Sequence, residues 1–99
     1  GVKHEPFDVG DEVTFYADFV DAAGQPADPT TVTLKVKDPS GAETEYTAGQ
    51  LTNPTVGRYE RAVVVDASGR WHYAFRGTGS VQIAVEKTVQ VRSSSLSYP

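Results

Sequence analysis

The residues that could carry acid–base or nucleophilic chemistry are few in this chain. It has two histidines, His4 and His72, and neither cysteine nor methionine. Without cysteine there can be no disulfide, thiolate zinc site, iron–sulfur cluster or cysteine nucleophile. No G-x-S-x-G, H-E-x-x-H or calcium-loop spacing occurs, and Gly-Thr-Gly-Ser at 77–80 favours a tight turn over a phosphate loop. We therefore expect no catalytic residue, no cofactor and no enzymatic activity.

Carboxylates stand at several predicted turns. If successive strands reverse direction, one end of the domain gathers five of them: Asp8, Asp11, Glu12, Asp38 and Asp66. Calcium takes six to eight oxygen ligands, so such a set could hold the ion. Aspartate is also a common turn-capping residue. We favour turn capping and expect no metal site, while a divalent ion near Asp11, Asp38 and Asp66 stays an open alternative.

The elements that must position these residues follow a period of two. Val13, Phe15, Ala17 and Phe19 alternate with more polar neighbours, which is typical of a half-buried strand. Gly, Pro and Asp clusters such as Asp38-Pro-Ser-Gly41 separate similar runs. Seven strands are predicted, at 6–9, 12–20, 31–37, 42–47, 57–66, 70–77 and 81–91. Short strands with turns about every ten residues predict an all-β sandwich or barrel.

One residue breaks the alternation in the last predicted strand. Val81, Ile83, Val85, Val89 and Val91 share one parity, and Lys87 shares it too. A charge that faces the core in mid-strand is costly. We therefore expect a bulge or bend near 86–88.

Length and composition limit the organisation and the partners. The chain has 99 residues, 38 % hydrophobic and 22 % charged, which predicts one globular domain. Its formal charge of −4 argues against binding to nucleic acid or anionic lipid, and no apolar run reaches the ~18 residues of a membrane span. We expect a domain over 1–92 and a Ser-rich tail over 93–99. The alternative for the tail is an extension that orders on a neighbouring subunit through Leu96 and Tyr98.

One motif resembles a known module. Gly57-Arg58-Tyr59 before a strand resembles the tyrosine corner of immunoglobulin-like sandwiches, in which a tyrosine hydroxyl bonds to the backbone. Arg61 stands where an antibody domain would have a cysteine, so a disulfide-type domain is not expected. The resemblance implies an immunoglobulin-like sandwich of about seven antiparallel strands, with Gly57, Tyr59 and Trp71 as structural residues.

The order of motifs is closer to one group. Gly10-Asp11, Ala27-Asp-Pro-Thr-Thr-Val32, Asp38-Pro-Ser-Gly41 and Gly69-Arg-Trp71-His-Tyr73 resemble small immunoglobulin-like proteins encoded among the structural genes of tailed bacteriophages. The resemblance covers residues 7–91. It implies a non-enzymatic virion component, such as a capsid decoration, head–tail or tail accessory protein. Its partners would be other virion proteins or further copies of itself, and it would assemble in the host cytoplasm.

The outward strand positions supply the candidate contact residues. In an immunoglobulin-like arrangement, strands 31–37, 70–77 and 81–91 share one sheet, and its outward positions are largely basic. The other sheet is expected to present Asp18, Glu60 and Glu43 or Glu45, together with an apolar group. We expect two docking faces of unlike charge. Their partner-binding residues are Tyr16, Ala62 and Val64 on one face and Lys35, Lys37, His72 and Arg76 on the other, with Arg70 beside them.

Two other functions remain open at this point. One is a free-standing adhesion or carbohydrate-binding module, for which exposed aromatic side chains would have to line a face; only Tyr16 and Tyr98 qualify. The other is one immunoglobulin-like repeat of a longer protein at the bacterial cell surface. Sandwiches of this kind host many roles, so the fold alone does not choose between them.

Overall fold

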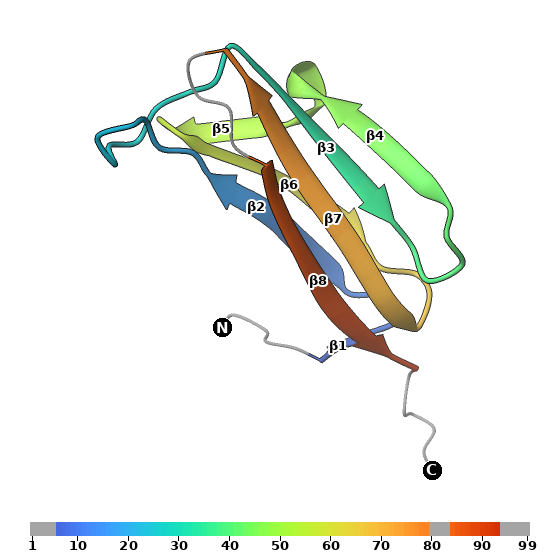
Figure 1. Ribbon diagram of the computed structural model, residues 1–99. Helices are drawn as coiled ribbons and strands as arrows, with labels where there is room; N and C mark the ends of the chain where they lie inside the picture. Colours follow the sequence, from blue (N-terminus) through green and yellow to red (C-terminus); the bar gives the residue numbers. More distant parts are fainter. Residues whose placement is uncertain (1–5, 80–83, 94–99) are drawn as a thin grey trace.

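The computed structural model describes residues 6–79 and 84–93 (Figure 1). Apart from one 3₁₀ turn, η1 (Ala48–Gln50), all regular structure there is β, as the alternation predicts. The strands are β1 (Phe7–Asp8), β2 (Glu12–Asp18), β3 (Thr31–Lys37), β4 (Glu43–Thr47), β5 (Thr52–Thr55), β6 (Arg58–Val64), β7 (Gly69–Thr78) and β8 (Ala84–Arg92). His4, Val81, Ile83, Leu96 and Tyr98 lie outside the described residues.

The strands form two sheets. The five-stranded sheet has the order β1-β8-β7-β3-β4, and the three-stranded sheet has the order β2-β6-β5. β3, β7 and β8, which cover the described parts of the strands predicted at 31–37, 70–77 and 81–91, therefore do share a sheet. All pairs are antiparallel except β1 with β8, where Phe7 pairs with Val91 in parallel.

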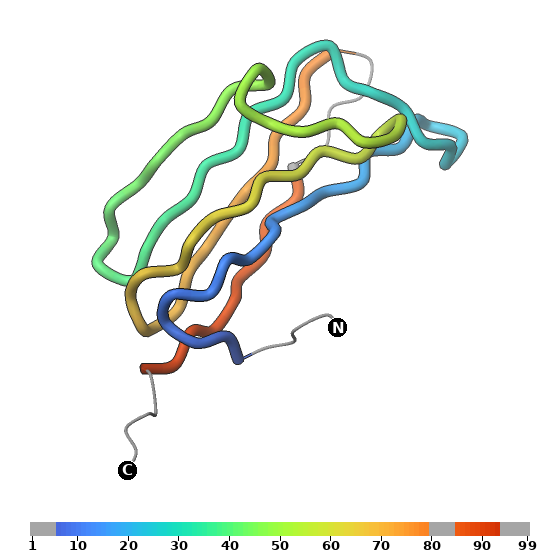
Figure 2. Tube along the Cα trace, turned by 180° about the vertical axis from the view of Figure 1, so that it is seen from behind, coloured from blue at the N-terminus to red at the C-terminus, as the bar shows by residue number. Residues whose placement is uncertain are grey.

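The described residues contain eight strands where the sequence predicts seven. The additional strand is β5, whose four residues are all exposed. Its Thr-Asn-Pro-Thr sequence has no apolar alternation, and proline is tolerated there because β5 lies at the edge of its sheet. Figure 2 shows the chain passing from β4 through η1 to β5, which carries it from one sheet to the other.

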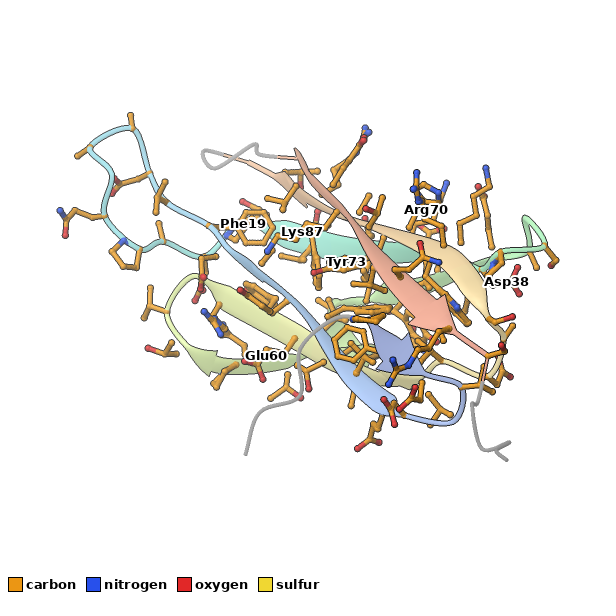
Figure 3. The ribbon with its side chains drawn as sticks, turned by 90° about the horizontal axis from the view of Figure 1, so that it is seen from below. Phe19, Asp38, Glu60, Arg70, Tyr73 and Lys87 are labelled. Carbon is orange, nitrogen blue, oxygen red and sulfur yellow. The ribbon has the colours of Figure 1, made fainter. Side chains whose placement is uncertain are left out.

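The core lies between the two sheets and consists of the predicted inward positions. Phe15, Phe19, Leu34 and Phe75 are fully buried. The rings of Phe15 and Tyr73 stack across the interface with centroids 4.3 Å apart. Figure 3 shows Phe19 and Tyr73 between the sheets, with Arg70 outside one sheet and Glu60 outside the other. The period of two thus correctly identifies the buried side of each long strand.

The predicted bulge near 86–88 is wrong. The pairing of β7 with β8 runs without a shift from Gly69–Val91 to Arg76–Ala84, and Lys87 pairs with Tyr73 in that register. Lys87 nevertheless is exposed, although it shares a parity with the half-buried Val85 and Val89. Its long side chain leaves the interior at the edge of the sheet, so the backbone does not need to bend.

The turn before β6 requires the glycine of the Gly-Arg-Tyr motif. Gly57 has φ +84°, and a Cβ placed on it would lie 2.5 Å from the backbone oxygen of Phe19. Its N–H donates to a carboxylate oxygen of Asp28 at 2.6 Å, and its carbonyl accepts from the N–H of Phe19 at 2.7 Å. Gly57 therefore joins the hairpin of β5 and β6 to the long loop between β2 and β3.

Trp71 is part of the core, and Tyr59 packs against it. The Tyr59 ring packs edge-on against Phe19, with centroids 5.8 Å apart. Burial of Tyr59, and then the Asp28 carboxylate, raise the pKa of the phenol. The Trp71 indole is buried and donates to the carbonyl of Ala67 at 2.9 Å.

Candidate functional site

The three predicted apolar contact residues lie together on the outer side of the three-stranded sheet. Tyr16 is on β2, and Ala62 and Val64 are on β6. In the antiparallel register, Tyr16 pairs with Glu60 and Thr14 with Ala62, which makes Tyr16 and Ala62 diagonal neighbours. Tyr16 is 37 % exposed and Val64 is 52 % exposed. We call Tyr16, Ala62 and Val64 the Tyr16 surface.

Arg58 holds the Tyr16 surface in place through a network of charges. Its guanidinium donates two hydrogen bonds to the carboxylate of Asp18, at 2.7 and 2.8 Å, and a longer one of 3.4 Å to Glu60. The carbon of the guanidinium lies 4.3 Å from the centroid of the Tyr16 ring. These hydrogen bonds lower the pKa of Asp18 and raise the pKa of Arg58. A paired and stacked arginine loses little further entropy in a contact, so the surface is pre-organised.

Lys87 reaches the same ring from the other sheet. Its Nζ lies 4.1 Å from the centroid of the Tyr16 ring. Its charge also contributes to lowering the pKa of Asp18, after the Arg58 hydrogen bonds. Among the described residues, β2 pairs only with β6, and β8 pairs with β1 only at Val91 and Arg92. Lys87 therefore bridges two strand edges on an open side of the sandwich.

The predicted basic residues lie together on the outer side of the five-stranded sheet. Lys35 and Lys37 come from β3, and Arg70, His72 and Arg76 come from β7. Lys37 pairs with His72 in the register of the two central strands. Within the part of the chain that the structure describes, Lys35 is the one member with an ion pair, 3.9 Å to Glu43. We call Lys35, Lys37, Arg70, His72 and Arg76 the cationic stripe.

Acidic residues border the cationic stripe on both sides. Glu43 and Glu45 on β4 pair directly with Lys37 and Lys35 on β3, and Glu86 on β8 pairs with Ala74 on β7. The small side chain of Ala74 leaves a broad, shallow hollow of about 820 Å³ between the longer ones. Lys35, Lys37 and His72 are among the residues that line it. Cationic donors on a sheet face suit carboxylate-bearing partners.

The prediction of one acidic sheet and one basic sheet is wrong for two reasons. Glu43 and Glu45 belong to the five-stranded sheet, beside the lysines, because β4 pairs with β3. Asp18 and Glu60 do lie on the three-stranded sheet, but Arg58 offsets their charge. The charges are thus arranged by strand: β4 is acidic, and β3 and β7 are basic.

The carboxylates considered for calcium are not brought together as a ligand set. The structure, over residues 6–79 and 84–93, holds no group of three or more acidic or histidine side chains placed for a metal. One Asp38 oxygen accepts from the N–H of Ser40, the Ser40 hydroxyl and the N–H of Ala42, which lowers the pKa of Asp38. Asp8 accepts from Arg92 at 2.6 Å. Asp38 therefore caps a turn, and Asp8 pairs with an arginine.

Arg61 lies on the side of β6 that faces the other sheet, since it pairs with the buried Phe15. Its guanidinium stacks on the ring of Tyr46 at 4.2 Å and donates to the carbonyl of Gln50 at 2.8 Å. Its Nε is buried without a hydrogen-bond partner in the described structure. Arg61 therefore joins β6 to β4 and η1 across the opposite open side of the sandwich.

Three residues that contact the Tyr16 ring or the turn before β6 were not predicted as functional from the sequence. Arg58 and Lys87 contact the Tyr16 ring, although they come 42 and 71 residues after it in the chain. Asp28 accepts from the N–H of Gly57, which lies 29 residues later in the chain. The one signal in the local sequence was the parity of Lys87, which places a charged residue at a strand position that faces the core.

Comparison with known protein families, with curated proteins and with solved structures finds no match to this chain. The described residues include no helix of the length and apolarity needed to cross a membrane. The function has to be argued from the surfaces themselves.

Proposed function

We propose that this chain is an immunoglobulin-like sandwich that serves as a non-enzymatic assembly module, acting through protein–protein contacts as an accessory component of a tailed-phage virion. The observation that carries the proposal is the Tyr16 surface, where Tyr16, Ala62 and Val64 are exposed together on one face. Single exposed apolar residues are ordinary, whereas a group with a tyrosine and a fixed arginine has the composition of an interface centre.

The order of the strands supports the immunoglobulin-like assignment. The arrangement β2-β6-β5 corresponds to strands B, E and D of that fold, and β4-β3-β7-β8 corresponds to C′, C, F and G. In this correspondence Tyr59 lies at the start of strand E, whereas the tyrosine corner of that fold precedes strand F, so the Gly-Arg-Tyr motif does not add to the assignment. The virion assignment rests on the resemblance of the motifs over residues 7–91.

The cationic stripe adds a second contact face. Lys37, Arg70 and Arg76 have no ion pair among the described residues, so a partner's carboxylates can approach without first displacing a bond. Exposed charges of one sign mainly raise the association rate and fix the orientation of the partner. The two faces lie on opposite outer sides of the sandwich, which allows one chain to join two neighbours.

The state of the Tyr16 ring favours a protein partner over a glycan. Sugar recognition needs a free aromatic face, and the Tyr16 ring already has Arg58 and Lys87 within 4.3 Å of its centroid. A protein contact uses the same cluster of tyrosine and arginine as it stands.

Quantitative mass spectrometry of purified particles tests the virion assignment. We expect peptides of this chain in particles from the phage that encodes it, at a fixed ratio to the major structural protein after gradient purification and a high-salt wash. Recovery of the chain only from the soluble fraction, with none in the particles, would rule out the assignment.

A further inference from the structure

The strand β4 is an open edge of the five-stranded sheet. In the described residues it pairs only with β3, and its five residues keep an unbroken register from Thr33–Thr47 to Lys37–Glu43. The outer side of β4 therefore carries main-chain N–H and C=O groups with no neighbouring strand. An edge of this kind can pair with an added strand.

The same edge borders a cavity between the sheets. A cavity of about 240 Å³ lies beside β4, and its lining includes Thr44, Tyr46, Val63 and Trp71. It is open because β5 pairs with β6 only at Arg58 and Glu60, which leaves the rest of β6 uncovered on that side. Thr44 and Tyr46 pair with the buried Val36 and Leu34, so an added strand would direct alternate side chains towards this cavity.

The charge at the edge is acidic. Glu43 and Glu45 occupy the outward positions of β4, and Asp38 and Asp66 are among the residues that line the cavity. A strand added to β4 would place its outward side chains opposite the two glutamates. Opposite charges in directly paired positions stabilise a sheet, and like charges destabilise it. Pairing of β4 with β4 of a second copy would set glutamates against glutamates, so a second copy is disfavoured.

The chain itself shows which sequence pairs with β4. Along the edge that β4 shares with β3, each β4 residue has one partner: Tyr46 pairs with Leu34, Glu45 with Lys35, Thr44 with Val36 and Glu43 with Lys37. Lysines meet the glutamates, and apolar side chains enter the core. A strand added at the free edge of β4 would meet the same side chains: Glu43 and Glu45 on the outer face of the sheet, and Thr44 and Tyr46 on the face toward the core.

We propose that the outer edge of β4 binds an extended segment of another protein in which Lys or Arg alternates with apolar residues. The backbone of the segment adds a sixth strand to the sheet. Its basic side chains pair with Glu43 and Glu45, and its apolar side chains enter the cavity beside Tyr46 and Trp71. The inference goes beyond the Tyr16 surface and rests on the proposed function only in taking a protein as the partner.

A peptide titration tests the proposal. The probe is an acetylated and amidated peptide with the sequence of β3, Thr31–Lys37, added to the ¹⁵N-labelled full chain. We expect shift changes and slowed amide exchange centred on Glu43–Thr47. A peptide with Glu in place of both lysines should bind roughly tenfold more weakly.

Variants of the protein give the matched control. Glu43→Lys with Glu45→Lys should reverse the preference, so that the Glu-substituted peptide binds more tightly than the Lys peptide. Glu12→Lys with Glu86→Lys, which makes the same charge change away from β4, should keep the original preference. If the first variant does not fold, Glu45→Gln alone, which breaks no ion pair among the described residues, should still weaken binding about threefold.

Three results would overturn the proposal: equal binding of the two peptides, shift changes confined to the cationic stripe, or no binding at millimolar peptide. Loss of the chain from phage particles would not affect the titration, so failure of the proposed function and failure of this inference are separate results.

Discussion

The ammonium of Lys87 lies 4.1 Å from the centroid of the Tyr16 ring and so links the edge of the five-stranded sheet to the edge of the three-stranded sheet. The position of Lys87 in the strand faces inward, yet its side chain ends at the surface. An inward-pointing charge near a sheet edge hinders pairing with another chain. Lys87 thus protects the open side formed by β2 and β8.

Replacing Lys87 by valine should therefore promote self-association. Lys87→Val removes the charge from the edge and makes the inward parity of β8 continuously apolar, which favours pairing between chains. We expect dimers or larger species in sedimentation velocity at concentrations where the unmodified chain shows none. Lys37→Val removes the same charge from the face of a central strand and should leave the association state unchanged. Identical behaviour of the two variants would refute a protective role.

Gly57 should tolerate alanine poorly. Gly57→Ala places a methyl group 2.5 Å from the Phe19 oxygen at φ +84°, so both the turn and the packing must shift. Strain of this kind costs on the order of 1–3 kcal/mol in the free energy of unfolding. Gly49→Ala is the control, since Gly49 has open space around its Cα and no positive φ. Denaturant unfolding should separate the two variants, and equal midpoints would contradict this account of the turn.

Arg61 should contribute more through its packing than through its charge. Arg61→Met keeps a long side chain on Tyr46 and removes the unpaired buried Nε, so we expect stability within about 1 kcal/mol of the unmodified chain. Arg61→Ala opens a gap between β6 and β4 and should cost roughly 2 kcal/mol. The measurement is the free energy of unfolding in urea. A methionine variant as unstable as the alanine variant would show that the charge is required.

The pKa of Tyr59 predicts a loss of stability in alkali. Burial raises the pKa of the folded phenol above 10, and Asp28 raises it further. Between the unfolded and folded pKa values the unfolded chain has lost a proton that the folded chain keeps, so stability falls as pH rises above 10. Tyr59→Phe should flatten this alkaline slope, and Asp28→Asn should reduce it in part. Parallel slopes for the unmodified chain and Tyr59→Phe, measured between pH 9 and 11.5, would disprove the linkage.

Local alternation predicts the buried side of each strand but not which strands become neighbours. Val13, Phe15 and Leu34 are buried as predicted because their faces depend only on parity. The strand β5 is not predicted, because its residues are exposed on an edge and have no apolar pattern.

For the contact surfaces too, parity predicts which face a residue lies on but not which strand lies beside it. Tyr16, Ala62 and Val64 are correctly placed on one outer face, as are the five residues of the cationic stripe. The sheet that holds Glu43 and Glu45 depends on the pairing of β4 with β3, which parity does not specify. The ion pair of Arg58 with Asp18 joins positions 40 residues apart, and local sequence carries no sign of it.

Incorporation of a Tyr16-surface variant into phage particles is the most direct test of the assembly function. Tyr16→Asp with Val64→Asp puts two carboxylates on the Tyr16 surface, and Ala22→Asp with Ser68→Asp adds the same charge at exposed loop positions as the control. Both proteins should remain folded by circular dichroism. We predict that the first is lost from purified particles by tenfold or more and that the control stays at the unmodified level. Equal incorporation of the two variants would contradict the claim that this surface makes the contact.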